Sequence, residues 1–241
     1  MELIALKNKI CDSFSGSQDE LNQVLEMVSL DKSVFPFNEY EHLILNLINL
    51  DGLTYAQYIE IRSEYISENP YLWIFEISAP TTFGKFAQTY VQGKSASLKI
   101  PSKKIDLTFS NEYDLWLDGI KIEVKASRAV NSDSQEPLYV KALSRNTNQP
   151  FLMNFQQLKP QCCHVFVWVA VFRDEIVTWV MSASEVLTHS LYSKGQHRGN
   201  NGNEGQLHIT HDNINSLNQF DLKNANIADV ITAAAKRNSI I

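Results

Sequence analysis

Apolar residues recur at helical spacing through the first 70 residues of the chain, and this period predicts helices. The helical pattern is clearest over residues 3–30 and 39–50, and again from Thr54 to about residue 67. Thr54 and Gln57 have the three-residue spacing of a capping box at the start of the last helix. We therefore expect a helical N-terminal subdomain at residues 1–75.

Further along the chain the period of the apolar residues becomes two, which is typical of strands. Asp118-Gly119 has the composition of a two-residue hairpin turn, which requires positive φ. The pattern predicts an α/β domain at residues 76–241, with a mixed central β-sheet flanked by helices. The expected helices are 82–91, 184–189 and 224–237, and the expected strands are 105–109, 113–117, 120–126, 163–172 and 176–181.

The charge of the chain argues against a protein that coats nucleic acid without specificity, because the net charge is −6. That charge is unevenly distributed. Residues 1–80 hold 4 Lys and Arg against 13 Asp and Glu, whereas residues 81–241 hold 17 against 14. We expect a polyanion to meet the C-terminal two-thirds of the chain.

No apolar run reaches the roughly 18–20 residues that a membrane-spanning helix needs, and no secretory signal is evident at the N-terminus. The 3 cysteines include no Cys-x-x-Cys pair, so the sequence does not indicate a zinc site. We expect reduced thiols, no membrane association and a cytoplasmic location.

Candidate chemistry is concentrated between Asp114 and Lys125, around the predicted hairpin turn. On the returning strand apolar and charged residues alternate, so Lys121, Glu123 and Lys125 should share one face while the apolar residues face the core. Asp114 lies on the partner strand, and cross-strand neighbours are roughly 5 Å apart. Asp114 and Glu123 could therefore share a cation.

Two carboxylates, with water and substrate phosphate completing the shell, are how Mg²⁺ is usually held. Asp114 and Glu123 are accordingly our candidate ligands for Mg²⁺, with the Val124 carbonyl as a further one. Such a metal offsets charge on a phosphate and lowers the pKa of an attacking water. Lys125 could orient that water or stabilise the charge that develops on the phosphate.

The pattern Asp-x8-Glu-x-Lys on adjacent strands resembles the PD-(D/E)xK nuclease motif, with Asp114, Glu123 and Lys125 as catalytic residues. Tyr113 stands where the motif name has proline. The order of elements over about residues 82–189 is similar to the family's αβββαβ core, and the apolar strand that includes residues 165–172 resembles its next core strand. The resemblance implies a restriction-endonuclease-like core.

Several alternatives remain open from the residues themselves. The charged residues of the strand could be a solvated row with no chemistry. Asp106 is an alternative to Asp114, Asp118 fits a turn residue better than a ligand, and Glu76 could supply an extra acid from the preceding helical region.

Two polar loops are candidates for contacts with base edges, because Arg pairs with guanine and Asn or Gln with adenine in the major groove. The first, at residues 193–205, is rich in glycine, which would let it approach a duplex closely. The second covers residues 144–154. Lys94, Lys99, Lys103 and Lys104 could hold phosphates, and Arg128 could also contact the DNA backbone. Our candidate DNA contacts are Lys194, Gln196, His197, Arg198, Asn200, Asn201, Asn203, Arg128, Arg145, Asn146, Lys103 and Lys104.

The resemblance implies a type II restriction endonuclease: a sequence-specific, Mg²⁺-dependent enzyme that hydrolyses double-stranded DNA to 5′-phosphate and 3′-hydroxyl ends. It further implies a prokaryotic source and a homodimer whose two-fold symmetry matches a palindromic site. A repair or recombination nuclease with the same core is one rival. A non-catalytic DNA-binding module and a generic protein-interaction domain are the others.

Overall fold

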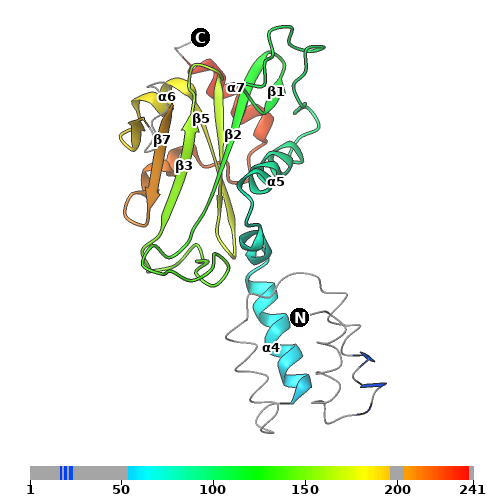
Figure 1. Ribbon diagram of the computed structural model, residues 1–241. Coiled ribbons are helices and arrows are strands. Elements are labelled where there is room, and N and C mark those ends of the chain that lie inside the picture. Colours follow the sequence, from blue (N-terminus) through cyan, green and yellow to red (C-terminus); the bar gives the residue numbers. More distant parts are fainter. Residues whose placement is uncertain (1–16, 18, 21, 24–53, 196–203, 239–241) are drawn as a thin grey trace. The chain divides into compact units, whose positions relative to one another are not determined.

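The computed structural model describes residues 17, 19–20, 22–23, 54–195 and 204–238 (Figure 1). By its internal contacts the chain divides into two compact units, Met1–Phe35 and Pro36–Ile241. Residues 19, 20, 22 and 23 are helical, and the rest of the helices expected before residue 51 lie outside the described residues. The domain boundary expected at residues 75 and 76 falls at the end of a short 3-10 helix and stays a prediction.

Helix α4, Tyr55–Glu68, begins at the predicted capping box. The Thr54 N–H donates to Gln57 Oε1 at 2.9 Å, and the Gln57 N–H donates to Thr54 Oγ1 at 3.3 Å. The helix ends before Asn69-Pro70, as expected, because proline restricts the residue before it to extended conformations. The 3-10 helix η1, Leu72–Glu76, and helix α5, Pro80–Gln92, follow.

A four-stranded mixed sheet forms the centre of the domain, in the order β1-β2-β4-β5. Its strands are β1 (Leu115–Leu117), β2 (Ile120–Arg128), β4 (Val165–Val171) and β5 (Ile176–Ser182). β2 runs parallel to β4, and the other two pairs are antiparallel. Asp118 and Gly119 have φ values of 44° and 94°, so the predicted positive-φ hairpin turn joins β1 to β2.

The strand expected at residues 105–109 is wrong. The Asp106 carboxylate accepts hydrogen bonds from the backbone N–H of Thr108 at 2.9 Å and from its hydroxyl at 2.7 Å. The Asp106 N–H donates to the carbonyl of Ser102. These local bonds hold the segment as consecutive turns, because an aspartate side chain offers the backbone an alternative to a strand ladder.

A second sheet of three antiparallel strands, in the order β3-β7-β6, was not expected. It comprises β3 (Leu152–Leu158), β6 (Tyr192–Lys194) and β7 (Gly205–Thr210). The chain between β2 and β4, all of it described, contains β3 and no helix, so this part of the expected αβββαβ order is also wrong. Residues 193–205 are a loop only in part, because Lys194 and Gly205 pair at its two ends.

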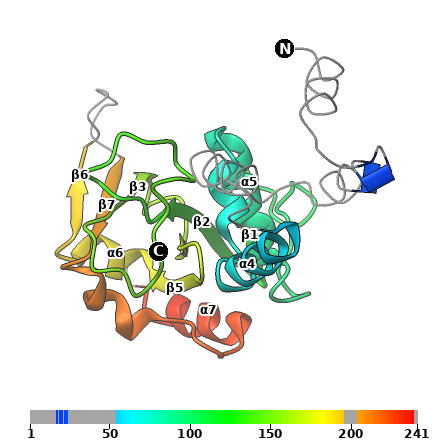
Figure 2. The same cartoon turned by 90° about the horizontal axis from the view of Figure 1, so that it is seen from below.

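The two sheets enclose the main core. Aromatic residues of β4 and β5 pack against β3, and the rings of Phe155 and Trp168 meet edge to face at 5.2 Å. The connecting elements are α6 (Ala183–Thr188) and η2 (Ile214–Phe220), and the chain's last described helix is α7 (Ile227–Lys236). Helix α7 packs against β4 and β5, and Figure 2 shows it on the side of these strands away from β3 and β7. Helices and a mixed sheet thus confirm the predicted α/β class.

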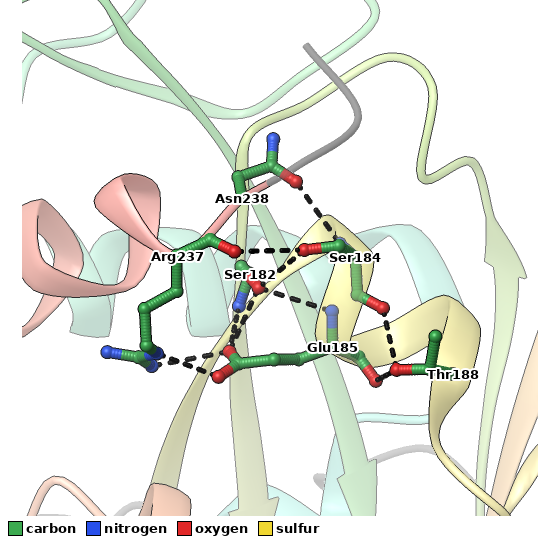
Figure 3. A network of polar contacts seen from close by, with 6 residues as sticks. All are labelled: Ser182, Ser184, Glu185, Thr188, Arg237 and Asn238. Carbon is green, nitrogen blue, oxygen red and sulfur yellow. Dashed lines mark hydrogen bonds and ion pairs between the residues drawn. The ribbon is translucent and has the colours of Figure 1, made fainter.

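A polar network fastens the start of α6 to the end of α7 (Figure 3). Ser182 and Glu185 form a capping box at the first turn of α6. The Arg237 guanidinium donates to the two Glu185 carboxylate oxygens at 2.7 and 3.2 Å. Burial raises the pKa of Glu185, but the bonds from Arg237 and Ser182 outweigh it, so the net pKa is lowered. The predicted helices at 184–189 and 224–237 are therefore confirmed and mutually anchored.

Candidate active site

A cavity of about 900 Å³ lies between α5, β2 and β3. One wall comes from α5, including Lys85 and Gln88, and another from the part of β2 between Glu123 and Arg128. The third wall comes from the second sheet. All three residues of the predicted catalytic set line this cavity: Asp114, Glu123 and Lys125.

Asp114 is fixed at the N-terminal end of β1 by three hydrogen bonds. Its N–H donates to the Ile122 carbonyl at 2.9 Å, which continues the β1–β2 ladder by one residue. Its Oδ2 accepts the Val124 N–H at 2.9 Å, and its carbonyl accepts the Gln88 amide at 2.8 Å. The hairpin and α5 together hold the Asp114 carboxylate beside β2.

Glu123 and Lys125 lie two residues apart on one face of β2 and form an ion pair, with 2.7 Å between Lys125 Nζ and Glu123 Oε1. Their side chains are only 17% and 19% exposed. A solvated row of charges would be far more exposed, so the surroundings of these two residues favour a site over a solvent face.

Burial dominates the electrostatics of the two carboxylates. The net pKa of Glu123 is raised to about 7, because burial, the largest cause, and the nearby Asp114 charge together outweigh the opposing effect of Lys125. Burial also raises the pKa of Asp114, against the Val124 N–H and the charges of Lys125 and Lys85. Two acids held close together in low dielectric need a cation to ionise easily.

The donors at this site suit Mg²⁺ better than a softer metal. Among the described residues no group of three or more His, Cys, Asp and Glu could hold a metal ion. Two carboxylates are nevertheless sufficient for Mg²⁺, which keeps several waters. The Val124 N–H points to the β1 side of β2, and in a strand the carbonyl of the same residue points to the same side. The Val124 carbonyl therefore faces the edge at which Asp114 lies.

The alternative acids are placed elsewhere. Asp106 accepts the Tyr113 hydroxyl at 2.7 Å and pairs with Lys121 at 3.6 Å, and hydrogen bonds from Thr108 and Tyr113 lower its pKa to about 2. Asp118 is in the hairpin turn, as expected. Glu76 ends η1 and does not line the cavity, and burial raises its pKa.

The candidate DNA contacts are dispersed. Arg128 lines the cavity, but its guanidinium donates to the carbonyls of Ile74, Phe75 and Ile77, and burial lowers its pKa to about 10. Arg145 stacks over a buried phenylalanine ring. The contacts exposed outside the cavity are Asn146, Lys103, Lys104 and Lys194, and those outside the described residues are Gln196, His197, Arg198, Asn200, Asn201 and Asn203. All of these contacts stay predictions.

Sequence reasoning missed the cavity's other polar residues. Lys85 and Gln88 are one helical turn apart on α5, and Gln156 and Gln157 are adjacent on β3. The Lys-x-x-Gln spacing was a usable signal, since residues three apart share a helix face. Nothing in the sequence pattern showed that β3 would cross to this cavity.

The chain matches no protein-family model, and no curated protein matches it. Within the part of the chain that the structure describes, no helix is both long and apolar enough to cross a membrane.

Proposed function

We propose that the protein is a Mg²⁺-dependent endonuclease that cleaves double-stranded DNA at specific sequences, as a type II restriction endonuclease does. The observation that carries the proposal is the convergence of Asp114, Glu123 and Lys125 in one cavity. The β1–β2 hairpin followed by a parallel strand supports a restriction-endonuclease-like core. A homodimer that cuts a palindromic site is part of the same proposal.

Each residue has a distinct role in the proposed reaction. Asp114 and Glu123 would hold Mg²⁺, with the Val124 carbonyl as a third protein ligand. Bound Mg²⁺ would supply positive charge at the scissile phosphate and lower the pKa of a water. The Lys125 ammonium, held by Glu123, would donate hydrogen bonds to that water or to a phosphate oxygen. Hydrolysis breaks the bond to the 3′ oxygen and leaves a 5′-phosphate and a 3′-hydroxyl.

The test is cleavage of unmethylated phage DNA in MgCl₂ and in EDTA, with the wild type and with Asp114→Asn and Lys125→Ala. Lys121→Ala is the matched control, because Lys121 lies on the same face of β2 but outside the cavity. We expect discrete fragments that require Mg²⁺, are lost in both site variants and persist in the control. Oxyanion-stabilising and positioning residues of this kind contribute about 100-fold or more to rate.

Other outcomes separate the rivals. A metal-dependent smear would favour a repair or recombination nuclease without site specificity. Intact DNA in every lane, together with tight binding in Ca²⁺, would favour a non-catalytic DNA-binding module. Intact DNA with no binding would refute the proposal in every form and favour a protein-interaction domain.

A further inference from the structure

Strand β3 is irregular where it passes the candidate active site. Between its pairs with Leu207 and Gly205 of β7, it carries one residue more than β7 does. The extra length forms a bulge at Gln156 and Gln157. Bulges re-aim side chains and are over-represented next to active sites.

The bulge places Gln157 in the left-handed region, at φ 58°. A residue with a Cβ is strained in this conformation, and glutamine lacks both the freedom of glycine and the local hydrogen bonding by which asparagine tolerates it. Strain of this kind persists where the surroundings enforce it, and it gathers at functional sites. A glycine here would be less strained, so the glutamine side chain is the feature to explain.

The consequence of the bulge is that two adjacent glutamines line one cavity. In a regular strand Gln156 and Gln157 would point to opposite faces. Asn154, two residues before Gln156, lines the same cavity, and its Oδ1 is buried with no hydrogen-bond partner among the described residues. Three residues with carboxamide side chains therefore line this wall of the cavity. We call Asn154, Gln156 and Gln157 the carboxamide row.

The walls of the cavity differ in charge. Every ionisable side chain that lines it comes from α5, from β2 or from Asp114, whereas β3 contributes only Leu152 and the carboxamide row. Phosphate oxygens only accept hydrogen bonds and favour cations, but a carboxamide both donates and accepts. Base edges present donors and acceptors together, and adenine matches a carboxamide in a bidentate pair.

We infer that the carboxamide row reads base edges of the DNA, adenine above all, while the phosphate being cut lies at Asp114, Glu123 and Lys125. This inference rests on the proposed endonuclease function. Strand β3 would then determine specificity, because its bulge lets a second glutamine face the substrate.

The test is selection of bound duplexes from a randomised DNA library in Ca²⁺, followed by sequencing, for the wild type and for the double variant Gln156→Ala/Gln157→Gly. Glycine accepts positive φ, so the double variant should fold. The single variant Gln157→Asn is the second probe, because asparagine tolerates this φ and keeps a shortened carboxamide. Gln135→Ala, an exposed glutamine outside the cavity, is the matched control.

We expect the wild type and the control to enrich the same sequence. The double variant should lose about tenfold discrimination at one or more adenine-containing positions while still binding DNA through its phosphate backbone. Gln157→Asn should shift the base preference at fewer positions. Unchanged preference in the double variant would overturn the role of the carboxamide row and leave the proposed function standing. A wild type that binds no DNA would overturn both.

Discussion

Replacing Glu123 with glutamine should stabilise the metal-free protein at alkaline pH, even though Glu123 belongs to the proposed active site. Its carboxylate is only 17% exposed and lies beside Asp114, so ionising it in the folded state is unfavourable. Glutamine has nearly the shape of the protonated acid and carries no charge. The substitution therefore removes a buried charge and leaves the cavity's shape in place.

The magnitude follows from the pKa. Burial raises the pKa of Glu123 from 4.5 to about 7, and a shift of that size corresponds to about 3 kcal/mol. Because the folded-state pKa is raised, the loss of stability begins as pH rises above 4.5 and is complete above about pH 7. Lys125 loses its ion-pair partner in the variant, so we expect a net gain of about 1–3 kcal/mol above pH 8 and little change near pH 5.

The assay is urea unfolding in EDTA at about pH 5 and about pH 8.5, for the wild type, Glu123→Gln and the control Glu112→Gln, whose carboxylate is exposed. A gain in the free energy of unfolding at the higher pH should raise the urea midpoint of the variant without changing the slope of that free energy against urea concentration. Equal midpoints for variant and wild type at the higher pH, or a gain of the same size at both, would show that Glu123 is not destabilised by burial.

Magnesium should reverse the order of stability of the wild type and Glu123→Gln. A ligand that binds only the folded state stabilises it, and the wild type has both carboxylates for the cation whereas Glu123→Gln has one. Saturating MgCl₂ is therefore expected to raise the midpoint of the wild type more than that of the variant. Equal increases would mean that Glu123 is not a ligand.

Three further substitutions test the structure around the site. Ser182→Ala removes the α6 capping box and should lower the free energy of unfolding by about 1 kcal/mol, measured by urea unfolding. Gly205→Ala puts a Cβ against the Tyr192 ring and should cost about 2 kcal/mol, less in a Tyr192→Ala background; a double-mutant cycle without coupling would contradict the contact. Arg128→Gln removes the guanidinium that donates to two carbonyls of η1 and to that of Ile77 just after it, and should cost about 2 kcal/mol, seen as earlier proteolysis near residue 77.

The local parts of the fold were predictable because their signals are contained in short stretches of sequence. Asp118-Gly119 determined the hairpin turn, and the turn together with the alternation in β2 placed Glu123 opposite Asp114. The uninterrupted apolar run of β4 indicated a strand buried on both faces, and in the structure every residue of β4 is buried. The candidate site could be assembled from the sequence because it spans one hairpin.

The second sheet could not be predicted, because its pairing joins residues about 50 positions apart in the sequence. Leu152 pairs with Thr210, and the sequence between them includes two strands of the other sheet. Polar residues such as Asn154 and Gln156 also gave β3 the composition of a loop. Its actual conformation is set by burial of Met153 and Phe155 on the opposite face, a tertiary effect that overrides local preference.

This failure bears directly on the proposed function. From the sequence alone, residues 144–154 and 193–205 were separate loops that could each reach DNA. In the structure the chain after residue 151 enters β3, and β3 pairs with the strand that begins at Gly205. The catalytic candidates on β2 and the carboxamide row on β3 then face one cavity from different sheets. Chemistry and recognition can be changed independently in such an arrangement, so substitutions on β3 should alter which DNA is bound before they alter the rate at which bound DNA is cut.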